Sequence, residues 1–279
     1  MNTWPPLRSF QATFASAASN TVASRFPQHE DKHHFDSLVR PEAVIARYLD
    51  DDTLARPSAV IISYSGMITS RLKERGFIRH GGYPQPWRYL WLRDGDTSLG
   101  VVEGFGYGAP GAAIVLEELI AFGATRFVNL GIAGALPREV AFGDLVLCTK
   151  ALRDEGVSHH YAAAERFAHP SPALRQALGE TLIRHGRSYV EGPAWTIDAL
   201  FRETREEAER YRDEGIVAVD METAALFVIA ATYGVDLAAL FVISDHLLAG
   251  ETWSLASDRA LLSEALGAGL SAAIETLSH

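Results

Sequence analysis

The fold class is indicated most directly by the stretch AALFVISDH, residues 238–246. It opens with six apolar residues, and a run this apolar predicts a strand that is buried on both faces of a sheet. The polar triplet Ser244-Asp245-His246 then marks the carboxyl end of that strand. Open α/β sheets bind ligands at the carboxyl ends of their strands, so this triplet is the first candidate for a functional site.

Similar apolar runs recur along the chain and alternate with helical patterns. They predict strands at 59–63, 99–103, 127–130, 145–149 and 216–219. Helical periodicity predicts helices at 112–122, 172–185, 204–211, 221–233 and about 258–277. Residues 79–96 are rich in Gly and Pro and predict a turn-rich loop before a strand. The alternation predicts an α/β fold with a largely parallel sheet, and no linker divides it.

Composition excludes several classes of protein. The formal net charge is −10 and the Lys and Arg residues are scattered, which argues against a nucleic-acid partner. No run of about 18 apolar residues occurs, so we expect no membrane span. The single cysteine, Cys148, lies in an apolar run and is expected to fill the core. His159 and His160 have no further ligands at metal-site spacing, so we expect no metal.

The N-terminal residues differ from the rest of the chain. The first 29 residues include Arg8 and Arg25 but no acidic residue, and prolines interrupt any long helix. We expect residues 1–32 to be a loosely ordered extension, or one packed on a neighbouring subunit, and residues 33–279 to form one domain. The extension has no apolar stretch of secretory length, so the cytoplasm is the expected location.

A glycine loop, Gly104-Phe105-Gly106-Tyr107-Gly108-Ala109-Pro110, follows one predicted strand and opens a helix. Backbone N–H groups at such a place can bind an anion. The spacing also matches a dinucleotide fingerprint, but that site requires an acid at the end of the next strand, which reads FVNLG at 127–131. The mismatch argues against NAD and leaves an anion site or a tight turn without ligand.

Two acidic clusters follow predicted buried strands. Asp220 and Glu222 lie in VDMETAA, residues 219–225, and Asp245 lies in the triplet that follows the last strand. Either cluster alone could cap a helix, and Asp220 in particular suits an N-cap. Glu222, however, precedes small and apolar residues where burial is expected, and a buried carboxylate requires a partner. Two such clusters together with a glycine loop favour a functional site.

Five motifs in order resemble those of the nucleoside phosphorylase family, which contains purine nucleoside phosphorylases, uridine phosphorylases and related nucleosidases. They are the glycine loop, NLGIAGA at 129–135, FGDLV at 142–146, VDME at 219–222 and SDH at 244–246. The resemblance covers most of the chain after about residue 33. It implies a single-domain, three-layer α/β fold around a mixed, partly barrel-like sheet. It also implies a homo-oligomer built from dimers, sometimes hexamers, whose active sites borrow residues across an interface.

The same resemblance implies roles for individual residues on the sugar side. Glu222 would accept hydrogen bonds from the ribose hydroxyls, Met221 would form the apolar floor under the sugar, and Asp220 would line the ribose site. His34 would reach the ribose 5′-hydroxyl of a neighbouring subunit. One carboxylate can accept both ribose hydroxyls, so Glu222 is a predicted catalytic residue.

On the base side, the resemblance implies that Asp245 protonates or hydrogen-bonds the purine and that Ser244 orients it. Such assistance matters because negative charge develops on the departing base. Val219 would line the base site, and Trp195 and Phe201 flank the segment where relatives stack the base. Each of these aromatic side chains could equally be core packing.

The chain departs from the family where phosphate binds. The nucleophile region comprises Gly66, Gly106, Asn129, Gly131 and Ile132. Relatives carry an early Gly-Asp-Pro-x-Arg loop where this chain reads SYSGMI at 63–68, an arginine at the position of Asn129, and a hydroxyl residue at that of Ile132. Loss of a charge-assisted hydrogen bond weakens anion binding by about 1.5 to 3 kcal/mol. Nearby cations that could substitute are Arg71, Arg75, Arg79 and Arg88.

The sequence therefore predicts a nucleoside phosphorylase, a pentosyltransferase that converts a purine-type nucleoside and phosphate into free base and ribose 1-phosphate. No cofactor is expected, and phosphate is the co-substrate. The missing phosphate ligands leave two alternatives. One is a nucleosidase that uses water as the nucleophile, and the other is a non-catalytic nucleoside-binding protein.

Overall fold

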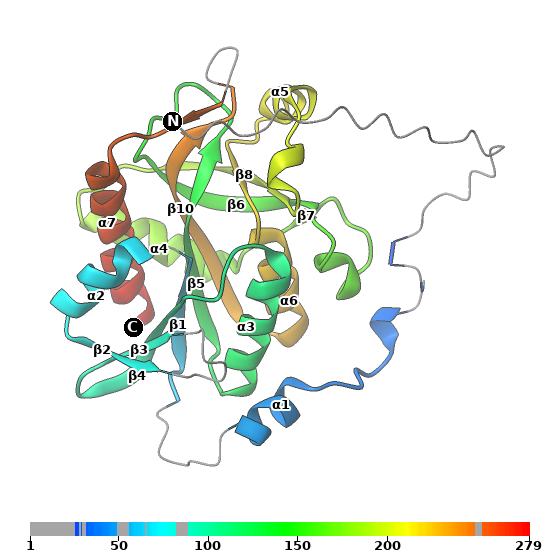
Figure 1. Ribbon diagram of the computed structural model, residues 1–279, viewed down its shortest axis with the longest axis vertical. Helices are drawn as coiled ribbons and strands as arrows, with labels where there is room; N and C mark the ends of the chain where they lie inside the picture. Colours follow the sequence, from blue (N-terminus) through cyan, green and yellow to red (C-terminus); the bar gives the residue numbers. More distant parts are fainter. Residues whose placement is uncertain are drawn as a thin grey trace, which may run out of the picture.

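The computed structural model describes residues 26–27, 29, 32–48, 56–64, 66–81, 89–248 and 253–279. Most of the predicted extension, residues 1–32, and part of the predicted loop, residues 82–88, lie outside these ranges. The described chain forms one mixed sheet covered by helices on both faces (Figure 1).

Eleven strands lie between residues 59 and 255 of the described chain. They are β1 (Ala59–Ser63), β2 (Phe77–Gly81), β3 (Tyr89–Arg93), β4 (Asp96–Glu103), β5 (Arg126–Ala135), β6 (Leu145–Asp154), β7 (Phe167–Ala168), β8 (Val190–Ile197), β9 (Ala218–Asp220), β10 (Asp236–His246) and β11 (Ser254–Leu255).

The helices lie between these strands. They are α1 (Pro41–Tyr48), α2 (Thr69–Glu74), α3 (Ala109–Ala121), α4 (Pro172–Arg184), α5 (Arg205–Asp213), α6 (Thr223–Tyr233) and α7 (Arg259–Leu277). Short 3-10 helices complete the described chain: η1 (Lys32–His34), η2 (Gly66–Ile68), η3 (Ser158–His160) and η4 (Leu200–Arg202).

The sheet is open at one end and closed into a barrel at the other. Its order is β11-β10-β6-β8-β9-β5-β1-β4-β3-β2, and β10 also pairs with β5, so β5, β10, β6, β8 and β9 form a closed ring. The predicted mixed, partly barrel-like sheet is confirmed. Parallel pairing holds for β4, β1, β5 and β10, whereas β6 and β9 run antiparallel to their neighbours β10 and β5.

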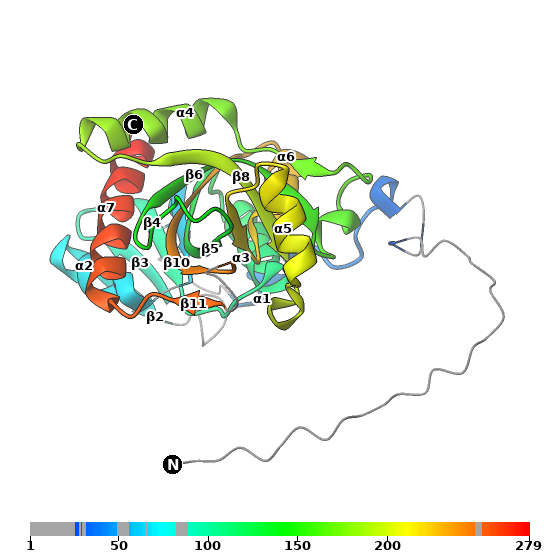
Figure 2. The ribbon, with the colours of Figure 1, turned by 90° about the horizontal axis from the view of Figure 1, so that it is seen from above.

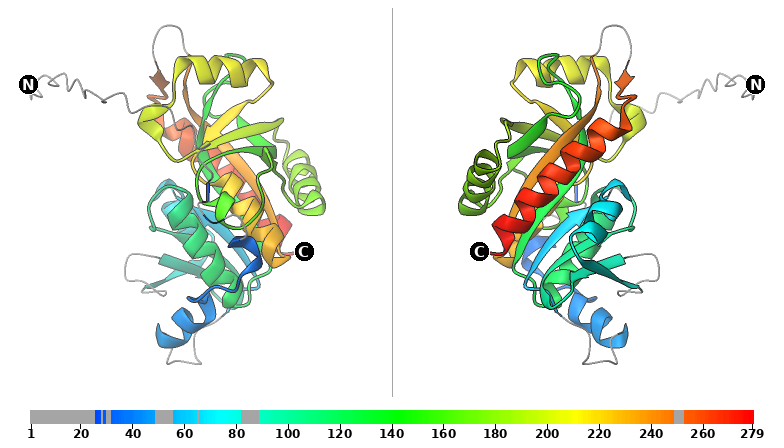
Figure 3. Two further views of the ribbon diagram at one scale, coloured as in Figure 1. Left: turned by 90° about the vertical axis from the view of Figure 1, so that its right-hand side faces the viewer. Right: turned by 90° about the vertical axis from the view of Figure 1, so that its left-hand side faces the viewer.

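Strand β10 is buried on both faces, as its composition predicts. Its odd-numbered residues from 237 to 243 belong to the core on the side of α3 and α6. Its even-numbered residues from 238 to 242 belong to the core on the side of α4 and α7. The views in Figures 2 and 3 show these helix layers on opposite sides of the sheet.

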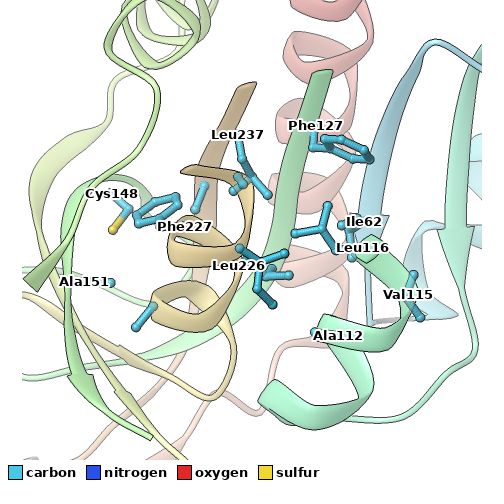
Figure 4. Packing of buried hydrophobic residues seen from close by; sticks show 14 of the residues in the cluster. Ile62, Ala112, Val115, Leu116, Phe127, Cys148, Ala151, Leu226, Phe227 and Leu237 are labelled. Atoms are coloured by element: carbon cyan, nitrogen blue, oxygen red, sulfur yellow. The ribbon is translucent and has the colours of Figure 1, made fainter. Parts of the chain in front are cut away.

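Helix α6 is apolar all round because it lies between α3 and the barrel. Figure 4 shows Leu226 on the side of Leu116 from α3 and Phe227 on the side of Cys148 from β6. All four of these side chains are essentially inaccessible to solvent. Cys148 is buried, as expected, and burial raises the pKa of its thiol, which makes it inert core filling.

Helix α7 is the one described helix that is long and apolar enough to cross a membrane, judged by length and composition alone. However, 61% of its apolar window is buried inside the protein. It packs against β5 and β10 through residues such as Leu266 and Leu270, which are fully buried. This is the behaviour of a core helix.

Candidate active site

The glycine loop and the end of β9 meet although they are 114 residues apart in the chain. The backbone N–H of Gly108 donates a 2.6 Å hydrogen bond to Oε1 of Glu222. Gly108 precedes α3, and Glu222 precedes α6, and these two helices lie side by side (Figure 1). Gly108 has φ 99°, a conformation that favours glycine, so the loop residue that holds Glu222 is fixed by its backbone.

Glu222 is a buried carboxyl with an altered proton affinity. Burial and the adjacent charge of Asp220 raise the pKa of Glu222 to about 8, while the Gly108 N–H opposes this shift. The side chain is 7% exposed. A buried carboxyl with a raised pKa reduces the free energy of unfolding, so its presence suggests a functional role.

Asp220 is engaged by the protein itself. Its Oδ1 accepts a 2.6 Å hydrogen bond from Thr196, and its Oδ2 accepts from the backbone N–H groups of Glu222 at 3.1 Å and Thr223 at 2.8 Å. Burial raises its pKa, and these hydrogen bonds oppose the rise. Asp220 thus fixes the turn that carries Glu222. Met221 lies half-buried between the two acids, and the predicted ribose contacts of Asp220 and Met221 stay predictions.

Asp245 lies at a bulge near the end of β10, where the register against β5 shifts between Ile243 and Asp245. A bulge re-aims the side chains that follow it. Ser244 Oγ donates to Asp245 Oδ1 at 2.7 Å, and Trp253 Nε1 donates to Oδ2 at 2.8 Å. Both carboxylate oxygens therefore face hydrogen-bond donors, and the predicted roles of Ser244 and Asp245 at the base stay predictions.

Gly134 links the two acidic clusters. A Cβ placed on it would lie 2.8 Å from Asp245 Oδ2 and 2.9 Å from Val219 Cγ1. Val219 precedes the turn that ends in Glu222, and Gly134 pairs with Val219 in the sheet. Val219 and Asp245 therefore lie on either side of Gly134, and Glu222 follows Val219 by three residues; the predicted roles of these residues stay predictions.

The predicted nucleophile region contains three buried polar atoms without a hydrogen-bond partner: Ser63 Oγ, Tyr64 Oη and Asn129 Oδ1. The amide nitrogen of Asn129 donates to Thr223 Oγ1 at 3.1 Å. Burial, followed by the charges of Glu222 and Asp220, holds the pKa of Tyr64 well above its usual range. Tyr64 and Asn129 lie on the side of α3 and α6, whereas the alternation of β1 places Ser63 on the side of Ala59 and Ile61, the other face of the sheet. Unpartnered buried polar atoms are rare in proteins, so Tyr64 and Asn129 mark a place where a small polar molecule can bind.

One of the predicted glycines, Gly131, borders Tyr64. A Cβ on Gly131 would lie 3.4 Å from the ring of Tyr64, and that ring packs edge-on against Phe105 of the glycine loop with centroids 5.2 Å apart. Gly66 and Gly106 have open space where a Cβ would be. Ile132, 39% exposed, supplies no polar contact.

The nearby arginines are engaged elsewhere. Arg75 donates to Ser271 of α7 at 2.7 Å, and the Arg71 side chain packs on Gly267 of the same helix. Arg79 lies over the ring of Tyr89 at 4.4 Å. Arg88 lies outside the described residues. The three described arginines therefore supply no replacement for the cations that phosphate binding in the family employs.

Trp195 packs in the core, one of the two roles that the sequence leaves open, and its predicted contact with the base stays a prediction. Trp195 is fully buried in β8, its Nε1 donates to Asp154 Oδ2 at 2.9 Å, and its ring packs on Tyr211 at 4.9 Å. A central barrel strand carries it into the core. Phe201, in contrast, is 95% exposed on η4, so its predicted stacking role stays open.

His34 lies on η1 and is exposed. The neighbouring His33 places its Nε2 2.9 Å from the backbone oxygen of His159, and Lys32 Nζ lies 2.9 Å from His160 Nδ1. These contacts attach η1 to η3 of the same chain, and the predicted contact of His34 with a neighbouring subunit stays a prediction. The described residues contain no group of three or more His, Cys, Asp or Glu side chains that could hold a metal ion.

A pocket of about 440 Å³ adjoins Asp245. Trp253, which donates to Asp245, forms one wall, and the other lining residues are Leu200, Phe201, Glu203, Thr204, Arg205, Ala208, Leu247 and Leu248. Burial and the charge of Asp245 raise the pKa of Glu203 to about 7. Sequence reasoning missed Glu203, because its place before a charged helix resembles any solvated helix start.

Fold and site together define an α/β protein of the nucleoside phosphorylase class, with a part-closed sheet, a glycine loop bound to a buried glutamate, and an aspartate at the end of the neighbouring strand. The chain belongs to the phosphorylase superfamily, whose family model matches residues 89–276. The predicted family membership is confirmed.

Comparison with individual proteins agrees with this membership. The chain is 33% identical over 154 residues to a guanosine phosphorylase of Halorubrum lacusprofundi, which covers 55% of this chain and 64% of the relative. It is 29% identical over 181 residues to a DeoD-type purine nucleoside phosphorylase of Bacillus cytotoxicus, covering 62% and 75%. The match thus spans slightly less than two thirds of the first relative.

Solved structures share the fold. A uridine phosphorylase from Vibrio fischeri superposes with a TM-score of 0.71 at 23% identity, covering 88% of this chain and 99% of that one. An AMP nucleosidase from Bacteroides thetaiotaomicron gives 0.66 at 22% identity, covering 85% and 97%. At these identities the likeness concerns the fold, and it confirms the predicted fold class.

Proposed function

We propose that the chain is a nucleoside phosphorylase that cleaves the N-glycosidic bond of a purine nucleoside with phosphate, releasing free base and ribose 1-phosphate. The observation that carries the proposal is the buried Glu222, which the glycine loop holds at 2.6 Å, at the same sheet edge as Asp245. Family membership and relatives named guanosine and purine nucleoside phosphorylases support it.

In this proposal Glu222 binds the ribose hydroxyls above Met221. The Gly108 N–H occupies one side of Oε1 and fixes the carboxyl, leaving its remaining lone pairs for the sugar. Asp220 keeps its own oxygens on Thr196 and on the turn, so it positions Glu222. Fixing the sugar in this way favours the transition state, in which positive charge develops on the ribose ring.

Asp245 assists the departing base. The bond breaks with negative charge developing on the purine, and an acid within hydrogen-bond reach stabilises that charge or neutralises it by proton transfer. Ser244 holds Asp245 from one side. Phe201 and Trp253, 95% and 58% exposed, offer aromatic faces in the adjoining pocket.

A second candidate function is hydrolysis, because the nucleophile region is neutral and polar. Tyr64 and Asn129 present an unpartnered hydroxyl and an unpartnered amide oxygen, and the charges that act on the Tyr64 pKa, after burial, are the carboxylates Glu222 and Asp220. These groups suit water better than a phosphate dianion. The nucleosidase remains the alternative to phosphorolysis.

The nucleoside and phosphate are the proposed small-molecule partners, without a further cofactor. A homo-oligomer built from dimers and a cytoplasmic location are also part of the proposal. Large apolar side chains exposed on the single chain, such as Phe35, Leu38 and Val39, are consistent with burial between subunits.

The deciding experiment measures base release from purine and pyrimidine nucleosides, by chromatography, with and without phosphate. Release that requires phosphate and yields ribose 1-phosphate supports the phosphorylase, whereas release without phosphate that yields free ribose supports the nucleosidase. Asp245→Asn distinguishes an enzyme from a binding protein. An enzyme loses turnover by orders of magnitude and keeps affinity, and a binding protein loses affinity alone.

A further inference from the structure

Helix α6 begins at a residue whose own side chain does not cap it. Its N-cap position is occupied by Glu222, and the Glu222 carboxyl makes no capping hydrogen bond. An N-cap side chain ordinarily accepts from the backbone N–H of the second or third helical residue, and the positive end of the helix dipole attracts an acid at this position. The N–H groups of this buried turn therefore need other acceptors if the Glu222 carboxyl is to stay free.

Two strands supply these acceptors. Asp220 of β9 accepts from the N–H of Thr223, the first helical residue, at 2.8 Å. Thr196 Oγ1 of β8 accepts from the N–H of Ala224, the second helical residue, at 3.0 Å. Thr196 thus binds an N–H that an N-cap side chain would ordinarily take. The two acceptors lie opposite each other in the parallel pairing of β8 with β9, so the cap of α6 is built from neighbouring strands.

The Thr196 hydroxyl holds Asp220 as well as the helix. It donates to Asp220 Oδ1 at 2.6 Å while its oxygen accepts from Ala224. Burial raises the pKa of Asp220, and the hydrogen bond from Thr196 opposes the rise, so it favours the ionised form that accepts more strongly from the helix. Thr196 is fully buried, and loss of its hydroxyl would leave the Ala224 N–H without water to replace it.

With this part of the helix start occupied, the Glu222 carboxyl is directed to the glycine loop. Its Oε1 accepts the 2.6 Å hydrogen bond from the Gly108 N–H. A carboxylate offers about four lone-pair sites, so acceptor positions remain for ribose hydroxyls. The position of this carboxyl therefore depends on which acceptor satisfies the first N–H groups of α6.

We propose that Thr196 is a positioning residue, which occupies the Ala224 N–H from β8 and so keeps the Glu222 carboxyl available to the ribose 2′- and 3′-hydroxyls. The inference rests on the proposed nucleoside cleavage and extends it to a residue that acts through Glu222. Without the Thr196 hydroxyl, the Ala224 N–H lies unpartnered beside the carboxyl of its own N-cap residue. Capping of α6 and binding of the ribose then compete for one carboxyl.

The test compares kcat/KM for guanosine with kcat/KM for 2′,3′-dideoxyguanosine, which lacks both hydroxyls that Glu222 would accept. Thr196→Val keeps the branched shape of the side chain and removes both hydrogen bonds. We expect its preference for guanosine to fall by about 10-fold or more. Thr196→Ser retains the hydroxyl and should stay within about twofold of the wild type. A purely structural defect would lower both kcat/KM values together and leave their ratio unchanged.

Thr276→Val is the matched control. Thr276 of α7 is buried and donates to Thr181 of α4 at 3.1 Å. This variant should lose stability and keep the wild-type ratio of the two nucleosides. Thr196→Ala removes the same hydroxyl without a branched side chain, and it carries the test if Thr196→Val does not fold.

An unchanged ratio in the variants that lack the Thr196 hydroxyl would overturn its role. An equal fall in Thr196→Ser or in Thr276→Val would contradict it too. A wild type that cleaves both nucleosides equally well leaves no ribose contact for Thr196 to protect, so the inference fails while the proposed cleavage stands. If the wild type releases base from neither compound, the proposed function fails, and calorimetric binding of both nucleosides tests Thr196 separately. A binding preference for guanosine that Thr196→Val loses and Thr196→Ser keeps supports the inference, and equal preferences contradict it.

Discussion

The backbone N–H of Gly108 donates to Oε1 of Glu222 at 2.6 Å and so joins the N-termini of α3 and α6. The bond gives the glycine loop a function that needs no bound anion, since the loop orients a buried carboxyl of the protein. Asp220 also holds this residue, because the backbone N–H of Glu222 donates to Asp220 Oδ2 at 3.1 Å. Glu222 is therefore held in place before substrate arrives. Its side chain loses less conformational entropy when the substrate binds.

Gly108→Ala should impair both stability and catalysis. Gly108 has φ 99° and ψ 153°, a region that an alanine side chain strains by about 1 to 3 kcal/mol. Relief of that strain moves the N–H away from Glu222, so we expect kcat/KM to fall at least about 10-fold. The control is Gly123→Ala at the end of α3, with φ 109° and equally open space. It should lose comparable stability in chemical denaturation yet keep its activity; equal activity losses would contradict the positioning role.

Glu222 should make the fold less stable as pH rises. Its folded-state pKa is about 8 against an ordinary value of 4.5, so the native state holds the proton more tightly than the unfolded chain. The contribution is fully present below about pH 4.5 and is lost as pH rises toward 8. The midpoint temperature of thermal unfolding should thus fall more steeply between pH 5 and 8.5 in the wild type than in Glu222→Gln. Glu180→Gln, exposed on α4, should keep the wild-type slope; parallel slopes for wild type and Glu222→Gln would refute the pKa shift.

Gly134→Ala should displace Asp245. The added Cβ would lie 2.8 Å from Asp245 Oδ2 and 2.6 Å from Leu247 Cδ1, contacts that real side chains do not tolerate. We expect destabilisation of about 1 to 3 kcal/mol together with a loss of kcat. In Gly179→Ala the new Cβ meets Tyr189 Oη at 2.7 Å, away from the site. That control should lose stability but retain kcat, and a Gly134→Ala enzyme with normal kcat would show that Asp245 is not constrained there.

Elements with local signals could be predicted from the sequence. The predicted starts of two helices, Thr204 and Asp258, are the N-caps of α5 and α7, because an N-cap is a property of a few consecutive residues. The uniformly apolar stretch 238–243 is likewise a central strand. The hydrogen bond of Ser244 to Asp245 follows from their adjacency, whereas the approach of Val219 to Asp245 across Gly134 depends on the antiparallel pairing of β9 with β5, which no local pattern reports.

Features that depend on distant pairing could not be predicted. Strand β8 contains Gly192 and Pro193 and has no alternation, so neither the strand nor the hydrogen bond of its Thr196 to Asp220 was foreseen. Without that strand, the sequence left Trp195 open between the core and the site, and the structure buries it in the core. The raised pKa of Glu203 comes from burial and then from the charge of Asp245, 42 positions later in the numbering, and no local pattern reports such proximity.

Tyr64→Phe should raise the stability of the protein and lower its rate of nucleoside cleavage. The Tyr64 hydroxyl is buried without a partner, and an unsatisfied buried hydroxyl weakens the fold by about 1 to 3 kcal/mol, so its removal should raise the unfolding free energy. If that hydroxyl holds the nucleophile, the variant should need more phosphate for the same rate, or hydrolyse more slowly, while KM for the nucleoside stays unchanged. Tyr233→Phe is the matched control, because Tyr233 donates to Glu117 at 2.8 Å and should lose stability but not activity. A Tyr64→Phe enzyme that is stabilised but fully active would show that this hydroxyl has no part in holding the nucleophile, because a functional site is the reason to retain an unpartnered hydroxyl beside the charges of Glu222 and Asp220.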